Sequence, residues 1–208
     1  PRSTPLYSSA ASDVYKRQAS EFAKGFIPNS INIGLDSNFA MWVGEMITDI
    51  KQAILLVTEP GREEESIIRL SRVGYDNTIG YLKGGFEAWR AAGKESDTVD
   101  RIDAKEFAKR HGGKPIVIDV RKKSEFDSEH VLDAINVPLN QINQHLAQFP
   151  KDTPFILHCA GGYRSMIAAS LLKSRGYHNL VEVRGGFNAI KNTDVKVTDY
   201  VCPSTLKK

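Results

Sequence analysis

Short apolar runs alternate with longer amphipathic stretches along most of the chain. A short apolar run predicts a buried strand, and apolar residues three or four apart predict a helix face. The expected strands are 53–57, 78–82, 115–120, 154–157 and 180–183, and the expected helices are 39–49, 63–73, 103–110, 140–148 and 166–172. Because strands and helices alternate, we predict an α/β fold with a mainly parallel sheet.

This order of elements occurs twice, at a spacing of about 100 residues, which indicates a duplicated domain. The matching pairs are Glu21-Phe22 with Glu125-Phe126, Ile31-Asn32-Ile33 with Ile135-Asn136-Val137, Gly74-Tyr75 with Gly176-Tyr177, and Gly84-Gly85-Phe86 with Gly185-Gly186-Phe187. We therefore predict two domains, 19–93 and 100–195, each with a mainly parallel sheet flanked by helices. A polar linker, 94–99, joins them, and 196–208 forms a C-terminal tail.

Residues 1–18 stand outside the repeat. The apolar strand of the second copy, Ile116–Arg121, has no evident counterpart before Glu21, so we expect the first domain to be truncated at its N-terminus and the natural chain to continue upstream. The run Asp13–Gln18 is what one reading frame of a common sequencing-library transposon end encodes. We predict that 1–18 is a non-native segment to be set aside in fold reasoning, with a disordered tail as the alternative.

The amino-acid composition limits the classes of protein to which the chain can belong. The 208 residues are 41% hydrophobic and carry a formal charge of +3, with basic and acidic residues interspersed. These values predict a water-soluble protein with neither a nucleic-acid nor a membrane surface. Two cysteines are too few for a disulfide framework and suit a reducing cytoplasm. The five histidines are scattered, so we predict no metal, and nothing in the sequence indicates a cofactor.

One cysteine occupies a chemically distinctive loop. Cys159 lies between the strand 154–157 and the helix 166–172, and it is followed by Gly161, Gly162 and Arg164. Glycines let successive N–H groups turn inward, and a helix N-terminus and an arginine add positive charge. A thiol in this setting is expected to exist largely as thiolate. The alternative is a buried structural cysteine beside a tight turn.

The pattern Cys159-Ala160-Gly161-Gly162-Tyr163-Arg164-Ser165, Cys-x4-Arg-Ser, resembles the active loop of the rhodanese (thiosulfate sulfurtransferase) family, and the resemblance extends over nearly all of the chain from Ala19 onward. It implies that Cys159 carries a persulfide between a small-molecule sulfur donor and a thiol-type acceptor, and that residues 160–165 bind the substrate. Cysteine phosphatases and arsenate reductases, which share the fold, carry Cys-x5-Arg, and the shorter loop here favours sulfur over an oxyanion.

Side chains around the loop leave several alternatives open. The resemblance implies that Arg121 faces the pocket and holds an anionic donor, whereas a structural alternative pairs it with Glu125. Arg164 either braces loop carbonyls or faces solvent, and Tyr163 either shapes access or is a surface tyrosine. Ser165 is expected to cap the helix, with a hydroxyl that can also bond the sulfur. His158 is not expected to reach the sulfur, because adjacent strand side chains point to opposite faces.

The first copy lacks this chemistry. Where the second copy has its cysteine loop, the first has Thr58-Glu59-Pro60-Gly61-Arg62, which resembles non-catalytic rhodanese domains. The segments Phe39–Gly44 and Thr198–Pro203 resemble bacterial proteins in which a metallo-β-lactamase-like persulfide dioxygenase precedes two rhodanese domains. This second resemblance implies a missing N-terminal partner domain, for which the chain would act as a persulfide relay or sensor. Cys202 is predicted to be a bystander, with a resolving thiol as the alternative.

Overall fold

The computed structural model describes residues 11–15, 19–35, 38–202 and 205. The elements of the first half are β1 (Ala11–Tyr15), α1 (Ala19–Lys24), β2 (Ile31–Asn32), α2 (Phe39–Met46), β3 (Ala53–Val57), α3 (Glu63–Ser71), β4 (Thr78–Tyr81) and α4 (Gly85–Ala91). Those of the second half are β5 (Asp100–Ile102), α5 (Ala104–His111), β6 (Ile116–Asp119), α6 (Lys123–Ser128), β7 (Ile135–Asn136), the 3₁₀ helices η1 (Leu139–Gln144) and η2 (Leu146–Gln148), β8 (Phe155–His158), α7 (Tyr163–Ser174), β9 (Leu180–Val183) and α8 (Gly186–Ile190).

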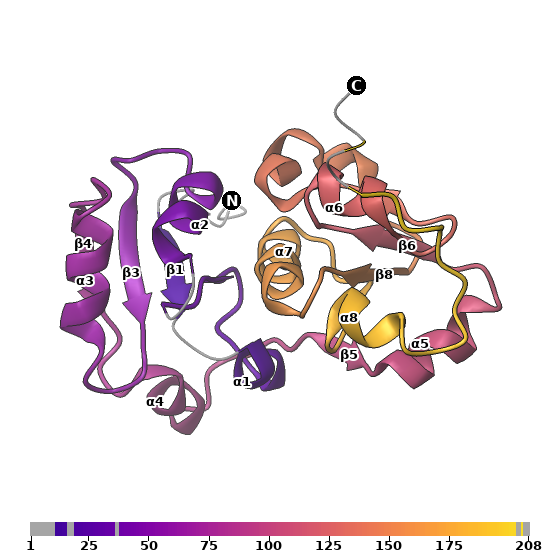
Figure 1. Cartoon of the computed structure of the whole chain (residues 1–208). Helices are drawn as coiled ribbons and strands as arrows, with labels where there is room; N and C mark the ends of the chain where they lie inside the picture. The colour runs from indigo at the N-terminus through magenta and orange to yellow at the C-terminus, as the bar shows by residue number, and fades with distance from the viewer. Residues whose placement is uncertain (1–10, 16–18, 36–37, 203–204, 206–208) are drawn as a thin grey trace, which may run out of the picture.

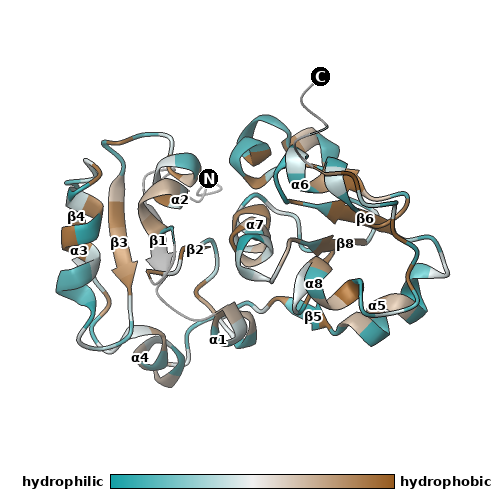
Figure 2. Cartoon of the chain, in the orientation of Figure 1, coloured by the Kyte–Doolittle hydropathy of each residue, from teal (hydrophilic) through white to brown (hydrophobic). Residues whose placement is uncertain are grey.

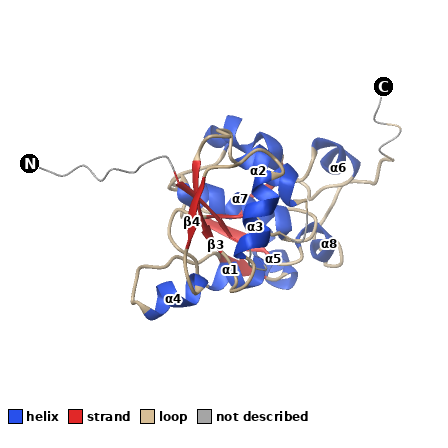
Figure 3. Cartoon of the chain, turned by 90° about the vertical axis from the view of Figure 1, so that its left-hand side faces the viewer, coloured by secondary structure: helices blue, strands red, loops and turns tan. Residues whose placement is uncertain are grey.

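Two parallel sheets confirm the predicted α/β fold and its duplication. The first sheet has the strand order β2-β1-β3-β4, and the second has β5-β9-β8-β6-β7. Read from the other edge, the second order is β7-β6-β8-β9, which matches the first strand for strand, and β5 is added at the far edge. Figure 1 shows the two halves side by side, and Figure 3 shows β3 and β4 of the first sheet with α3 beside them.

The expected gap in the first sheet is not present, so that prediction is wrong. Strand β1 occupies the central position, where Val14 pairs with Ile31 of β2 and with Leu56 of β3. The sequence Ala-Ser-Asp-Val-Tyr contains no continuous apolar run, so its strand character depends on ladders with neighbours distant in sequence. Residues 1–10 and 16–18 lie outside the described residues, and the predicted non-native origin of 1–18 stays a prediction.

The predicted elements agree with the structure except around residues 140–148. There the chain forms two 3₁₀ helices instead of one α-helix. Leu139 and Ile142, three residues apart, are both buried, and a spacing of three suits the three residues per turn of a 3₁₀ helix. At the start of α5, the Asp103 carboxylate accepts a hydrogen bond from the Glu106 N–H (2.8 Å) and caps the helix as expected. This bond is the main reason that the pKa of Asp103 is lowered.

Helix α7 lies between the two sheets and joins the halves into one core. Its residues from Ser165 to Lys173 are all buried, and the apolar cluster around it includes residues from both halves. Figures 1 and 2 show α7 between β1 and β2 on one side and β8 on the other. The Asn32 N–H donates to the Ser170 hydroxyl across this junction (2.9 Å). The helix that follows the Cys159 loop is therefore also a structural link between the two copies.

The segments predicted as linker and tail are fixed to the domains. Asp97 and Phe26 exchange backbone hydrogen bonds in an antiparallel bridge, with both N···O distances 2.9 Å. The Asp97 carboxylate also binds the buried Lys173 ammonium of α7 (2.9 and 3.0 Å). Beyond α8, Val197 bridges Val131. The polar linker is therefore attached to α7 through the Asp97–Lys173 pair, and we call this contact the clamp. The domain boundaries remain predictions.

Replacing Asp97 with alanine is expected to lower the free energy of unfolding by about 1.5–3 kcal/mol, the worth of a hydrogen bond to a charged group. The variant leaves Lys173, whose side chain is 8% exposed, without its carboxylate. Urea denaturation measures the effect. Lys24→Ala, which removes an exposed pair with Glu21, is the matched control and should change stability by less than about 1 kcal/mol. Equal effects of the two substitutions would show that the clamp does not stabilise the junction.

Candidate active site

Cys159 lies at the carboxyl end of β8, where the active site of an open parallel sheet is expected. The loop turns at Gly162, whose φ of 102° suits glycine, and α7 begins at Tyr163. The Cys159 sulfur accepts a hydrogen bond from the Gly162 N–H (3.1 Å), and the Ser165 hydroxyl oxygen lies 3.4 Å away. Cys159 is 1% exposed. The first turn of α7 thus directs polar groups at a buried sulfur, an arrangement that favours negative charge on it.

Backbone N–H groups at the second Gly-Gly-Phe repeat, residues 185–187, and at the residue after it bind carbonyls of the cysteine loop. The Phe187 N–H donates to the Cys159 carbonyl (2.7 Å), and the Asn188 N–H donates to the Ala160 carbonyl (3.0 Å). A Cβ at Gly186 would lie 2.2 Å from the Cys159 carbonyl oxygen, so this close approach requires glycine. In the first half, a Cβ at Gly85 would lie 2.4 Å from the Thr58 carbonyl oxygen. This close approach of a glycine to the carbonyl, which we call the clasp, is therefore present in both copies, and of the two matching loops only the second holds a thiol.

Ser165 does not cap the helix as predicted, because α7 begins two residues earlier. Its hydroxyl lies within the first turn and donates to Glu182 Oε1 (2.7 Å). Glu182 Oε2 accepts from Arg101 Nε of β5 (2.6 Å). The Glu182 side chain is completely buried, and this burial raises its pKa, while the Arg101 charge opposes the rise. Sequence reasoning missed both residues, although a glutamate inside the apolar strand 180–183 was the available signal.

Arg164 neither braces the loop carbonyls nor extends into solvent, in contrast to both predicted alternatives. Its guanidinium makes a bidentate ion pair with the Glu125 carboxylate of α6 (2.5 and 2.8 Å). The hydrogen bonds from Arg164 hold the pKa of Glu125 below its usual range. Arg164 therefore ties the first turn of α7 to α6.

Arg121 follows β6 in sequence, and its side chain pairs with Asp119 at the end of that strand, not with Glu125. Its guanidinium binds the Asp119 carboxylate (2.7 and 2.8 Å), donates to the Glu129 carbonyl (2.9 Å) and lies 4.0 Å from the centroid of the Phe187 ring. Both side chains of the Arg121–Asp119 pair are buried. None of these contacts is to the cysteine loop, so the predicted donor-binding role of Arg121 stays a prediction.

His158 and Tyr163 flank the loop in different ways. The buried His158 ring points Nδ1 at the Cys159 carbonyl (3.3 Å), not at the sulfur, and burial lowers its pKa, so it stays neutral. Tyr163 is half-buried, and its hydroxyl donates to the Gly34 carbonyl of the first half (3.1 Å). The first copy therefore contacts the active loop directly, and Tyr163 is not a plain surface residue.

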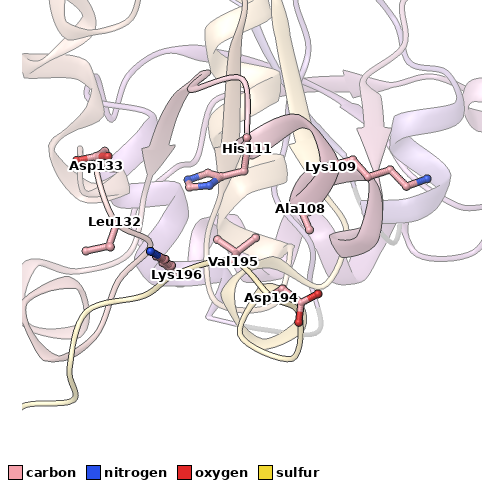
Figure 4. Close-up of a pocket in the computed structure, with 9 residues that line it drawn as sticks. Ala108, Lys109, His111, Leu132, Asp133, Asp194, Val195 and Lys196 are labelled. Carbon is pink, nitrogen blue, oxygen red and sulfur yellow. The ribbon is translucent and has the colours of Figure 1, made fainter.

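A cavity of about 500 Å³ lies away from this loop, at the C-terminal end of α5 (Figure 4). It is lined by residues that include His111, Leu132 and Val195, and no residue of the cysteine loop lines it. Residues 108–112 of its lining precede β6, Leu132 and Asp133 precede β7, and residues 194–196 follow α8, so the cavity lies near the amino ends of β6 and β7. Within the described ranges, no three His, Cys, Asp or Glu residues gather as a metal site, and no helix is long and apolar enough to cross a bilayer.

The Gly186→Ala variant should distort the loop and slow alkylation of Cys159 by iodoacetamide. Backbone strain at a φ of 53° and the contact with the Cys159 carbonyl act together. Gly176→Ala is the matched control, because Gly176 has a φ of 86° but a Cβ there meets no atom within 4 Å. The control should lose about 1–2 kcal/mol of stability from strain alone and keep the alkylation rate. Equal alkylation rates in both variants would contradict the clasp.

Arg121→Ala is expected to reduce stability by about 3–5 kcal/mol, because it leaves the buried Asp119 charge unpaired. Chemical denaturation measures this, and Arg121→Ala combined with Asp119→Asn should recover part of the loss. Unchanged stability together with poor use of thiosulfate would instead support the donor-binding role.

Comparison with known proteins places this geometry in a family. The rhodanese-like domain family model matches residues 13–92 and 103–193. YqhL of Bacillus subtilis, whose function is uncharacterised, is 38% identical over 71 residues, which are 34% of this chain and 56% of YqhL. A protein of Allochromatium vinosum named sulfurtransferase is 28% identical over 93 residues, 44% of this chain and 87% of that protein. The crystal structure of a rhodanese-like domain protein from Staphylococcus aureus is 26% identical, with a TM-score of 0.44, and covers 49% of this chain and 100% of that one. The chain, which spans about half the length of YqhL, thus belongs to the rhodanese-like domain family and contains two such domains.

Proposed function

We propose that the protein is a sulfurtransferase that carries sulfane sulfur as a persulfide on Cys159. The observation that carries the proposal is the buried sulfur at the N-terminus of α7, with the Gly162 N–H at 3.1 Å and the Ser165 hydroxyl at 3.4 Å. The Gly162 N–H and the N-terminus of α7 stabilise an anionic sulfur more than a neutral thiol. Relatives named as sulfurtransferases, among them that of Allochromatium vinosum, support the proposal.

The reaction consists of two displacements at sulfur. The Cys159 thiolate attacks the outer sulfur of thiosulfate or of a low-molecular-weight persulfide, a new S–S bond forms, and sulfite or a thiolate leaves with the electron pair of the broken bond. Cys159 then holds a persulfide whose terminal sulfur is anionic. An acceptor thiolate attacks that sulfur and expels the Cys159 thiolate, so the enzyme returns to its starting state with no external oxidant or reductant.

Phosphate chemistry fits the site less well. A phosphatase needs an arginine that faces the bound oxyanion, and here the Arg164 guanidinium is held by both oxygens of Glu125. The four residues between Cys159 and Arg164 also form a smaller loop than Cys-x5-Arg. An assay of thiosulfate against an aryl phosphate separates the two reactions.

A narrower role is a relay or sensor of persulfide for an upstream metallo-β-lactamase-like persulfide dioxygenase domain, in a bacterial cytoplasm. The thiol-free first copy favours a role in assembly over one in turnover, because Thr58–Arg62 offers no group that can carry sulfur. The resemblance of segments 39–44 and 198–203 to such fusion proteins is the support for this partner.

Incubation with thiosulfate is expected to add the mass of one sulfur atom to the protein, at Cys159. Intact-mass and peptide mass spectrometry under non-reducing conditions measure the gain, and cyanide or a small thiol should remove it. Cys159→Ser should lose both the mass gain and turnover, because a hydroxyl cannot form this intermediate. Cys202→Ser, which alters the exposed cysteine, is the matched control and should change neither. Extra sulfur on Cys202, or turnover by Cys159→Ser, would overturn the proposed function.

A further inference from the structure

The Ser165 hydroxyl lies between two groups that compete for its single proton. Its oxygen is 2.7 Å from Glu182 Oε1 and 3.4 Å from the Cys159 sulfur. A hydroxyl carries one proton and two lone pairs, and the short bond to a carboxylate takes the proton. A lone pair of Ser165 is then available to the thiol. The atoms form a continuous chain from the sulfur through the hydroxyl to a buried carboxylate.

Glu182 is buried directly behind the loop. A Cβ at Gly162 would lie 3.4 Å from Glu182 Oε1 and 3.7 Å from Arg101 Nη2, so the carboxylate and its arginine support the same turn that donates to the sulfur. The Glu182 side chain is completely buried, and this burial raises its pKa. A carboxylate in this environment accepts a proton more readily than an exposed one.

We propose that Glu182 is the proton acceptor for the Cys159 thiol and is reached through the Ser165 hydroxyl. The proposal deepens the sulfurtransferase function proposed above and rests on it. In the step, the S–H proton of Cys159 moves to the Ser165 oxygen while the Ser165 proton moves to Glu182 Oε1. The products are a thiolate, an intact serine hydroxyl and a neutral carboxylic acid.

This transfer leaves the net charge of the buried site unchanged, because one anion replaces another. Arg101 of β5 and Arg184, which follows β9, act on Glu182. Among the residues that the structure describes, the other charged or titratable groups near the loop are Arg164 with Glu125, Arg121 with Asp119, the neutral His158, and Tyr163, whose hydroxyl donates to the Gly34 carbonyl. The two arginines of this set are each paired with a carboxylate, and His158 points at a carbonyl, so Glu182 is the group connected to the sulfur by a hydroxyl.

The relay also changes the direction of the Ser165 hydrogen bond. Once Glu182 holds the proton, the Ser165 hydroxyl carries the proton that came from the thiol and donates it back to the thiolate as a hydrogen bond. One side chain therefore serves first as an acceptor from the thiol and afterwards as a donor to the anionic sulfur.

The test is the pH dependence of Cys159 alkylation by iodoacetamide, followed at the Cys159 peptide by mass spectrometry. Two groups that share a proton titrate in two macroscopic steps. The wild-type rate should therefore rise in two steps separated by at least about one pH unit, with a plateau between them. Glu182→Gln should show a single step, because glutamine keeps the hydrogen-bond acceptor but cannot take the proton.

Ser165 variants test the connecting hydroxyl and do not depend on whether Glu182→Gln folds. Ser165→Ala should lower the intermediate plateau about tenfold, the equivalent of one hydrogen bond to a charged group, and Ser165→Thr should restore it. A purely structural role for Glu182 would instead give a single step in the wild type. A single wild-type step, or two steps that persist in Glu182→Gln, would overturn the relay.

The failure of this inference can be told apart from failure of the proposed function. The alkylation assay contains no sulfur donor and reports only the ionisation of Cys159. The mass gain with thiosulfate reports sulfur transfer. A two-step alkylation profile without a mass gain would support the relay and overturn the sulfurtransferase, and a mass gain with a one-step profile would do the opposite. The Cys202 peptide of the same samples is an internal reference, because Cys202 is exposed and distant in sequence from the relay.

Discussion

The packing of α7 between two sheets is the constraint on which the rest of the structure depends. Its first turn directs the Gly162 N–H and the Ser165 hydroxyl at the Cys159 sulfur, and its length from Ser165 to Lys173 is buried. A helix that is covered on both sides cannot shift without disturbing two cores. The contacts of Asn32 with Ser170 and of Gly34 with Tyr163 transmit the same restraint from the first copy. The packing of the two copies against α7 therefore also fixes the positions of the groups that contact the Cys159 sulfur.

The two copies keep a common scaffold and differ in chemistry. In both, a second glycine approaches the carbonyl that ends the central loop-bearing strand, Gly85 over Thr58 and Gly186 over Cys159. The clasp therefore belongs to the fold and not to catalysis. The first copy retains it and uses its surface to cover α7, while the thiol and the helix that holds it belong to the second copy. This division explains how the first copy can lack a thiol and still contribute to the packing of α7.

The electrostatics of the site depend more on paired charges and oriented dipoles than on exposed cations. Three arginines near the loop are each bound to a carboxylate: Arg101 to Glu182, Arg121 to Asp119 and Arg164 to Glu125. The sulfur itself is contacted by a backbone N–H and a hydroxyl. Fixed dipoles of this kind would stabilise the anion of the proposed reaction without a large reorganisation when the charge moves from the thiolate to the terminal sulfur of the proposed persulfide. The ion pairs set the positions of the elements that carry those dipoles.

The sequence by itself determined the duplication, the α/β class, the position of Cys159 between a strand and a helix, and the Asp103 cap. These depend on local signals: apolar runs, glycine pairs, and a side chain that bonds its own backbone. Tertiary structure decided what depends on distant partners. Strand β1 is defined by ladders to β2 and β3, and 139–148 winds as 3₁₀ helices around the buried Leu139 and Ile142. Arg164 binds Glu125, and the Ser165 hydroxyl donates to Glu182, seventeen residues away in sequence. A charged or hydroxyl side chain takes the partner that the fold brings within about 3 Å, and no spacing in the sequence encodes that distance.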